Sequence, residues 1–589
     1  MISLSIFLFF IVIPNFTESS PRPKSGTNFE HHYRWPPPSY SYMGTFEKAA
    51  VTSDNGLCSE IGRNILIKGG NAVDAAIASM FCLGVTNPQS SGLGGGFVMT
   101  LYNRSEQKCH ILDARETAPN AASREMFLNN PNGSRYGYLA IGVPGELSGY
   151  WLAFKKYGSH KVSWYELVKP SVDLCRNGIP VTPYLAHTMK VKEYHFVQFP
   201  SMREWINPVT GTTYQTGDIM RRIKLGKTLE LIAKSDDPEE MFYRGEMADV
   251  MANEIQENGG IITKKDFANY KTREYPPLYT VDFAEDLVMC GGPPPSSFSV
   301  TQLIIALLGR YYGPHSKQNI LYRSSLFYHR LIEAQKHAYA HRTLLGDVAF
   351  VPTVAALAKN MTTKAYIDYI FSRMTDHAQP SEYYLGDQNA KMDFGTSHVS
   401  VLDKDGNGAS ATTTINRWFG AAVQSDEYAI VWNDEMDDFS TPGQENGFGF
   451  APSKTNFIEP GKRPMSSMSP MILFNGTDGK TKMVVGASGG SKIISALAKP
   501  VVRVLYFNET IKQAIDAPTL HNQFTPDVTQ YDETSPKKLI EDLKTIFGQT
   551  FKFTTGFEGI AQGIVVGDDG KIYANGDYRR EADMHPGGF

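Results

Sequence analysis

The amino-acid sequence predicts a layered α/β protein, with helices before residue 396 and β-strands after it. The first part carries the apolar periodicity of helices at residues 145–157, 225–234, 245–258 and 322–344. The second part carries short β-branched runs that are separated by glycine-rich turns. A chain of 589 residues with 41% hydrophobic content is long enough to bury such layers.

The strand-rich part begins with a predicted β-hairpin whose tip is Asp405-Gly406, a dipeptide that accepts the positive φ of a type I′ turn. In such a hairpin, residues whose numbers sum to about 811 lie opposite one another. This register places Thr396 against Thr414 to Asn416. The later elements are predicted strands at 428–433, 470–474 and 482–487, a helix from Ser491, and a hairpin with Asp569-Gly570 at its tip.

The hairpin tip also resembles a metal site, because DKDGNG matches the opening of a calcium-binding EF-hand loop. That loop needs a bidentate Glu at its twelfth position, which is Thr414 when counted from Asp403. The sequence also lacks HExxH, zinc-type Cys/His spacing, a P-loop after the glycine run SGLGGGF, and a GxSxG elbow in convincing context. We therefore expect neither a metal nor a separate cofactor.

The N-terminus predicts entry into the secretory pathway. MISLSIFLFFIVIPNF is too short to span a membrane, so residues 1–19 are interpreted as a signal peptide, with an uncleaved anchor as the alternative. Residues 20–44 are rich in proline and are interpreted as a linker. A net charge of −4 without a basic cluster indicates no nucleic-acid partner. Sequons predict glycosylation at Asn103, Asn132, Asn360, Asn475 and Asn508.

Two of the five cysteines flank a predicted turn between helices. Gly69-Gly70-Asn71 lies midway between Cys58 and Cys82, and Asn71 is placed to cap the second helix. Folding this αα-hairpin brings Cys58 beside Cys82, which favours a disulfide in an oxidising compartment. The alternative is two buried thiols.

Thr396 raises a chemical question, because an unaided threonine hydroxyl is a weak nucleophile. A threonine at a chain N-terminus solves this problem by using its own α-amine as the base. Thr396 would reach that position if the chain were cut at Gly395-Thr396. The polar, turn-rich stretch 375–395 directly before it is interpreted as an exposed connection, which makes such a cut reasonable.

Long motifs on both sides of this position resemble those of the γ-glutamyltranspeptidases, also called glutathione hydrolases. After Thr396 they are GTSHVSVLDKDGNGASATTTINRWFG, VWNDEMDDFSTPG, NFIEPGKRPMSSMSP and VVGASGGSKI. Before it they are GGNAVDAAIA, SSGLGGGF, DARETAP, GVPGELSGY and RTLLGD. The resemblance runs from about Thr45 to Phe589. It implies a four-layer αββα sandwich of the N-terminal-nucleophile hydrolase type, cut by itself into a large subunit (45–395) and a small catalytic subunit (396–589) that remain together as a heterodimer.

The resemblance also implies a reaction. Thr396 would attack the γ-glutamyl amide of glutathione or a related compound, and water, an amino acid or a dipeptide would resolve the resulting ester. Thr414 would orient the nucleophile, and Gly489 and Gly490 would supply oxyanion donors. The residues implied for holding the substrate's amino-acid head group are Asn416, Glu435 and Asp438 for the ammonium, and Arg115, Ser466 and Ser467 for the carboxylate.

Other interpretations stay open at this stage. Taken alone, Glu435 and Asp438 fit a solvated acidic loop better than a binding site. A catalytically silent relative that acts as a binding or decoy protein would keep the same fold. An acylase for a different amide is a third possibility, although it would not need the complete set of Arg115, Asn416, Glu435 and Asp438.

Overall fold

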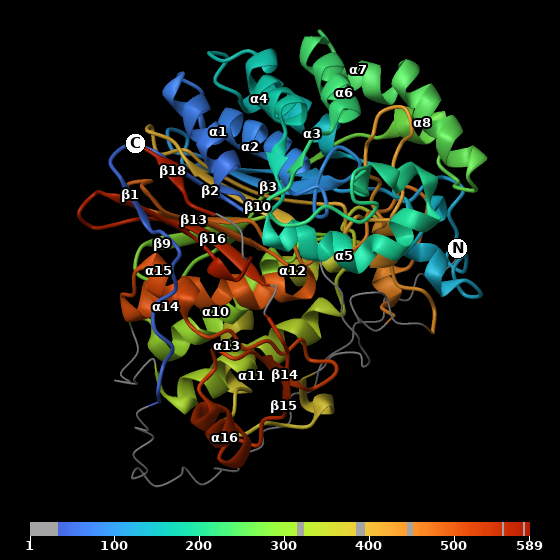
Figure 1. Ribbon diagram of the computed structural model, residues 1–589. Helices are drawn as coiled ribbons and strands as arrows, with labels where there is room; N and C mark the ends of the chain where they lie inside the picture. Colours follow the sequence, from blue (N-terminus) through green and yellow to red (C-terminus); the bar gives the residue numbers. More distant parts are fainter. Residues whose placement is uncertain (1–32, 315–322, 385–394, 444–451, 557–558, 581–583) are drawn as a thin grey trace, which may run out of the picture.

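Two seven-stranded antiparallel sheets pack face to face in the centre of the protein, with helices on both outer faces (Figure 1). The computed structural model describes residues 33–314, 323–384, 395–443, 452–556, 559–580 and 584–589. Sheet 1 has the strand order β18 (Gly587–Gly588), β2 (Ala50–Ser53), β10 (Ser397–Leu402), β11 (Gly408–Thr414), β3 (Gly96–Asn103), β4 (Lys108–Ala114) and β7 (Arg273–Tyr275). Sheet 2 has the order β1 (Gly44–Phe46), β17 (Ile572–Gly576), β16 (Ile560–Val566), β13 (Thr481–Ser488), β12 (Met471–Asn475), β9 (Leu287–Gly291) and β8 (Leu278–Thr280).

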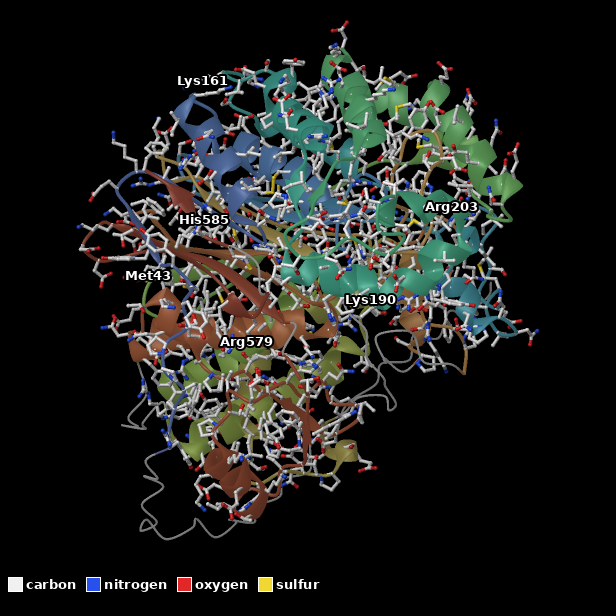
Figure 2. The ribbon with its side chains drawn as sticks, in the orientation of Figure 1. Met43, Lys161, Lys190, Arg203, Arg579 and His585 are labelled. Atoms are coloured by element: carbon white, nitrogen blue, oxygen red, sulfur yellow. A yellow bond between two sulfur atoms is a disulfide. The ribbon has the colours of Figure 1, made fainter. Side chains whose placement is uncertain are left out.

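Each sheet is covered by its own helical layer, and side chains fill the spaces between the layers (Figure 2). The layer on sheet 1 contains α1 (Gly56–Ile67), α2 (Ala72–Thr86), α3 (Glu146–Tyr157), α4 (Trp164–Asn177), α5 (Pro183–Gln198), α6 (Ile223–Lys234), α7 (Pro238–Tyr243), α8 (Glu246–Glu257) and α9 (Lys264–Asn269). The layer on sheet 2 contains α10 (Phe298–Tyr312), α11 (Ser325–Arg342), α12 (Pro352–Asn360), α13 (Lys364–Ser372), α14 (Ile493–Phe507), α15 (Ile511–Asp516) and α16 (Lys537–Thr545). The predicted helices at 145–157, 225–234, 245–258 and 322–344 are all present.

Both sheets contain strands from both sides of Thr396. Strands β10 and β11 of sheet 1 pack on β13 and β16 of sheet 2. The space between the sheets is filled by a compact apolar cluster that includes Tyr102, Phe474 and Ile564. A disulfide between Cys109 on β4 and Cys290 on β9, with sulfur atoms 1.97 Å apart, links the two sheets. The sequence interpretation did not pair these two cysteines.

The first two helices form the predicted αα-hairpin. The side chain of Asn71 accepts hydrogen bonds from the backbone N–H groups of Val73 and Asp74, and the Asp74 side chain accepts one in return, so this helix start has a full capping box. Cys58 and Cys82 are joined by a disulfide with an S–S distance of 2.04 Å. The prediction for this pair is confirmed.

The β10–β11 hairpin has the predicted pairing but a different turn. The observed partners, such as Ser400 and Ser410, have numbers that sum to 810, which is close to the expected register. A type I′ turn needs positive φ at both central residues, but within the tip only Gly406 has it (φ 82°). The loop is wider because Asp403 Oδ1 accepts hydrogen bonds from the backbone of Asp405 and Asn407, both at 2.9 Å. The first carboxylate of the calcium-like motif therefore holds the turn.

Three other expectations are wrong. Residues 428–433 form no strand; they contribute one isolated bridge, Gln424 to Val431, because positive φ at Ala429 breaks the extended run. The helix expected from Ser491 begins only at Ile493, since Ser491 lies within a 3₁₀ turn (Gly490–Lys492) before α14. The predicted linker is also wrong in part, since its residues 33–43 dock on the body of the protein and Tyr33 is buried.

Some predictions concern residues whose structure is not described. The signal peptide at 1–19, the linker before residue 33 and residues 385–394 of the predicted connection lie outside the described ranges. Across the ranges that are described, every helix is too short or too polar to cross a membrane. The five sequon asparagines all lie at the ends of elements or in turns, and none is buried. Their glycosylation stays a prediction.

Candidate active site

Thr396 lies directly before β10, in the middle of sheet 1, and its side chain meets that of Thr414 at the end of β11. The two Oγ1 atoms are 3.2 Å apart. Thr396 is buried, and its carbonyl oxygen accepts a hydrogen bond from Arg580 Nη2 at 3.3 Å. The register of one hairpin thus brings the predicted nucleophile to the residue that is predicted to orient it.

The backbone around Thr396 has an unusual conformation. Thr396 has a φ of 108°, a region that β-branched residues rarely adopt. Gly395 approaches the Asn416 carbonyl so closely that a Cβ on Gly395 would lie 1.8 Å from that oxygen. Only glycine fits at this position. Backbone strain of this kind costs roughly 1–3 kcal/mol and is found mainly at functional sites.

Asn416 lies just beyond the end of β11 and connects two motifs. Its backbone N–H donates to Thr414 Oγ1 at 2.8 Å, and its side-chain Nδ2 donates to the Asp434 carbonyl at 2.9 Å. Asn416 has a φ of 73°, so the strand ends at Thr414 and does not continue through Asn416. Both side chains nevertheless line one cavity, because the positive φ turns the chain back toward it.

Arg115 follows β4 and is fully buried against the acidic 3₁₀ turn Glu435–Asp438. One guanidinium nitrogen, Nη1, pairs with Glu435, and the other, Nη2, pairs with Asp438. The Nε atom faces the Pro464 carbonyl at 3.4 Å. The residue predicted to hold a carboxylate and the residues predicted to hold an ammonium therefore neutralise each other in this structure.

The electrostatics of this cluster are dominated by burial. Burial raises the pKa of Glu435 well above its usual range, and it raises the pKa of Asp438 against the attraction of Arg115. A third carboxyl group, Glu116, lies 3.5 Å from Arg115 Nη1, and burial raises the pKa of Glu116 to about 7. Three buried carboxyl groups thus surround Arg115, and Arg342 also attracts the carboxyl group of Asp438.

A cavity of about 40 Å³ lies beside Thr396. Ten of the predicted site residues can be located against it: Arg115, Thr396, Thr414, Asn416, Glu435, Asp438, Ser466, Ser467 and Gly490 line the cavity, and Gly489 precedes Gly490. Gly489 and Gly490 both have positive φ, at 112° and 57°, which turns the chain sharply before α14.

Sequence reasoning assigned no role to three residues that complete the site. Glu116 follows Arg115 within DARETAP, and Arg342 lines the cavity from the end of α11 within RTLLGD. Burial lowers the pKa of Arg342 to about 10. Arg580 is buried beside Thr396 and pairs with Asp54 at 2.6 Å. The first two lay in recognised motifs, whereas nothing in the local sequence marks Arg580.

Together, two helix-covered sheets and a buried threonine at the start of a central strand define the N-terminal-nucleophile hydrolase fold. A structural comparison agrees: the cephalosporin acylase from Bacillus halodurans superposes with a TM-score of 0.80 over 96% of this chain and 99% of its own, at 22% identity. That level of identity shows the fold alone.

Within that class, the chain belongs to the γ-glutamyltranspeptidase family, whose model matches residues 58–586. The chain is 40% identical to scoloptoxin SSD14 from Scolopendra dehaani over 92% of both chains. It is 35% identical to the glutathione hydrolase proenzyme of Escherichia coli, again over 92% of both. The γ-glutamyltranspeptidase of Helicobacter pylori superposes with a TM-score of 0.50 at 32% identity, covering 55% of this chain and 92% of that one. The protein is thus an enzyme of the γ-glutamyltransferase and glutathione hydrolase type.

A buried glutamate behind the site gives a prediction for stability. Glu146 Oε1 accepts from Thr413 Oγ1 at 2.7 Å and also contacts the Tyr150 hydroxyl, and burial raises the pKa of Glu146 to about 8. Between pH 4.5 and 8 the unfolded chain releases this proton while the folded chain keeps it, so stability falls with rising pH.

Glu146→Gln removes this titration and keeps the acceptor oxygen. From pH 5 to pH 7 the parent is expected to lose about 2 kcal/mol of unfolding free energy through Glu146, and the variant should not show this loss. Urea unfolding at several pH values, in an uncut Thr396→Ala chain so that one species unfolds, would measure this. A stability difference that does not change with pH would show that Glu146 is already ionised in the folded protein.

Proposed function

We propose that the protein is made as one chain, cuts itself at Gly395-Thr396, and then uses Thr396 to transfer γ-glutamyl groups to water or to the amine of an amino acid or dipeptide. Glutathione and its conjugates are the proposed donors. The proposal extends the family assignment to particular residues. The contact between Thr396 and Thr414 beside the Arg115–acid cluster is the observation that carries it.

The proposed maturation step uses the hydroxyl of Thr396 on its own peptide bond. Oγ1 attacks the Gly395 carbonyl carbon, the carbon–nitrogen bond breaks, and the hydroxyl proton passes to the released amine. Water then hydrolyses the ester, leaving a carboxylate at Gly395 and a free amine and hydroxyl at Thr396. Support comes from the φ of 108° at Thr396, because cutting the bond releases that constraint. The products are a large subunit ending at Gly395 and a small subunit of 194 residues, Thr396–Phe589 (589 minus 395).

Donor binding is proposed to exchange one set of ion pairs for another. The α-carboxylate of the γ-glutamyl group takes Arg115, with Ser466 and Ser467 as further donors, while the α-ammonium takes Glu435 and Asp438. Support comes from the self-paired cluster, which keeps all these charges buried without substrate. A zwitterion inserted between the partners satisfies both sides at once, whereas an uncharged acyl group would leave buried charges unpaired.

The catalytic steps follow from this placement. The amine of Thr396 accepts the proton as Oγ1 attacks the γ-carbonyl carbon, and that proton leaves with the departing amine. The resulting ester is attacked by water or by an acceptor amine, which regenerates Thr396. The backbone amides at Gly489 and Gly490 are the proposed oxyanion donors, and the sharp turn there supports this role. Asn416 is proposed to bind the ammonium with the acids.

We also propose that the mature enzyme is a secreted heterodimer. Two disulfides, one within a helical hairpin and one between the sheets, favour an oxidising compartment. Anchoring at the outer face of the plasma membrane by an uncleaved N-terminal segment remains the alternative. The silent-relative interpretation has no observation in its favour, because every proposed role has a residue of the right chemistry at the cavity.

The first test is an intact mass and N-terminal sequence of protein recovered from the secretory pathway, combined with turnover of a γ-glutamyl anilide. We expect two fragments, one of which begins Thr-Ser-His-Val, and anilide turnover that rises when a dipeptide is added. A stable single chain without turnover would favour the silent binding protein. Two fragments that hydrolyse a different amide but not the anilide would favour the acylase.

A further inference from the structure

We propose that residues 33–43, named here the N-terminal clasp, hold the small subunit in place after the chain is cut. The segment precedes the cut in the sequence, so it belongs to the large subunit. Its polar anchors, however, lie mostly on residues after Thr396. The inference rests on the proposed cleavage, and its test below is designed to work without that cleavage.

The first anchor is Tyr33, which is buried against helix α16 of the small subunit. Its hydroxyl donates to Asp542 Oδ2 at 2.9 Å. Trp35 stacks on Tyr328 of α11, with ring centroids 5.7 Å apart, and so ties the same end of the clasp to the large subunit. Pro36 to Pro38 follow. A proline run is stiff before it binds, so docking this segment costs little conformational entropy.

The second anchor is Ser39, which binds the end of helix α15 of the small subunit. Ser39 donates to both carboxylate oxygens of Asp516, from its backbone N–H at 3.0 Å and from its hydroxyl at 2.8 Å. Lys512 Nζ donates in the other direction, to the Ser39 carbonyl at 3.0 Å and to Ser41 Oγ at 2.9 Å. These are charge-assisted hydrogen bonds, which are roughly twice as strong as hydrogen bonds between neutral groups. Met43, at the left edge of the view in Figure 2, ends the clasp.

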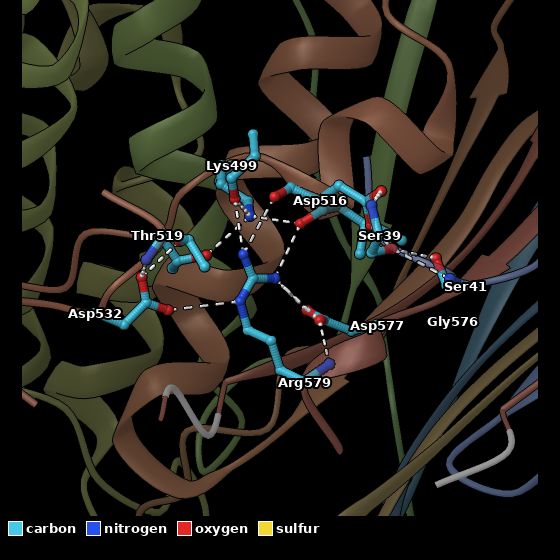
Figure 3. Close-up of polar contacts among 12 residues, drawn as sticks. Ser39, Ser41, Lys499, Asp516, Thr519, Asp532, Gly576, Asp577 and Arg579 are labelled. Carbon is cyan, nitrogen blue, oxygen red and sulfur yellow. Dashed lines mark hydrogen bonds and ion pairs between the residues drawn. The ribbon is translucent and has the colours of Figure 1, made fainter. Parts of the chain in front are cut away.

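Figure 3 shows the polar contacts around Asp516, the partner of Ser39. Lys499 Nζ donates to the Ile515 and Ala517 carbonyls at 2.8 and 2.6 Å, and Arg579 donates to the same two at 3.2 and 3.1 Å. Two buried side chains, Lys499 and Arg579, thus satisfy the last carbonyls of α15. They hold Asp516 in a defined position for Ser39.

Each subunit also contributes a short strand that pairs with a strand of the other subunit. Directly after the clasp, β1 pairs with strand β17 of the small subunit, with Gly44 opposite Ala574. In return, Phe589 of the small subunit lies on the large subunit, where its carbonyl accepts from the Lys48 N–H at 2.8 Å. The clasp therefore continues this exchange of strands on its N-terminal side. It contacts helices α15 and α16 of the small subunit, whereas β1 pairs with β17.

The test uses a two-chain protein that needs no self-cleavage. In a Thr396→Ala chain, one protease recognition sequence is inserted within residues 385–394 and a different one between Met43 and Gly44. The first protease produces the two subunits, and the second removes the clasp after the protein has folded. Release of the small subunit in moderate urea is then followed by size-exclusion chromatography.

We expect removal of the clasp to speed release of the small subunit by at least about tenfold, since a single hydrogen bond to a charged group contributes that factor. Ser39→Ala should give part of this effect. Tyr40→Ala is the matched control, because the Tyr40 side chain is 100% exposed in the same segment. Equal release rates with and without the clasp would overturn the proposal, whatever the outcome for self-cleavage.

A second measurement uses the natural protein. The N-terminus of the large subunit, read from secreted material, is expected at or before Tyr33, because trimming beyond that residue removes the first anchor. A mature large subunit that begins after Ser39 would also overturn the proposal.

Discussion

Thr396→Ala is expected to leave a single uncut chain with no measurable γ-glutamyl transfer, a loss of about four orders of magnitude or more. The substitution removes the only atom that the proposal uses as nucleophile, both for maturation and for turnover. We expect the fold to stay intact, because Thr396 lies just before β10 and its neighbour Gly395 is unchanged. Gel electrophoresis and the anilide assay measure the two losses separately.

The informative control is Thr396→Ser, which keeps the hydroxyl and loses the methyl group. We expect this variant to be cut more slowly and to retain a measurable fraction of activity. If Thr396→Ala were still cut at the same bond, the cleavage would come from another protease. If it were uncut but active, the nucleophile would lie elsewhere.

Arg115→Ala is expected to mature normally and to lose about a thousandfold in kcat/KM for the anilide, since two charge-assisted hydrogen bonds to a carboxylate are removed. Maturation does not use the head-group site, so the two-fragment pattern should persist. The variant also leaves Glu435 and Asp438 buried without their guanidinium partner, which raises the pKa of both groups further and weakens ammonium binding.

Two comparisons separate these effects. Arg115→Lys keeps the charge but not the two-donor fork, and it should fall between the parent and Arg115→Ala. Arg124 is an exposed arginine of the same region, and its guanidinium lies over the Phe457 ring. Arg124→Ala should therefore have the same activity as the parent. Normal turnover by Arg115→Ala would remove its role as the carboxylate clamp.

Local sequence patterns were sufficient wherever the deciding interaction is local. The capping box at Asn71 and the disulfide between Cys58 and Cys82 depend on one turn between two helices. The contact between Thr396 and Thr414 depends on the register of one hairpin. A single-residue shift there would turn every side chain to the other face, so register is strongly specified.

Other features could not be read from the sequence, because they join residues that are far apart in it. Arg115 is 320 residues from Glu435, and Cys109 is 181 residues from Cys290. The clasp was missed for a different reason. Proline-rich composition is typical of a linker, and nothing local shows that Tyr33 and Ser39 have carboxylate partners on α16 and α15.

Continuous motifs in the sequence were enough to identify the family, while the cut at Gly395-Thr396 and the roles of the site residues stay predictions. The arrangement of the site without substrate became visible only in three dimensions: Arg115 is paired with Glu435 and Asp438 around a cavity of about 40 Å³. This pairing arises because a charge buried away from water must find an opposite charge. The packing of the chain in three dimensions decides which opposite charge lies close to Arg115. A local sequence pattern does not contain this information, because the partners are far apart in the sequence.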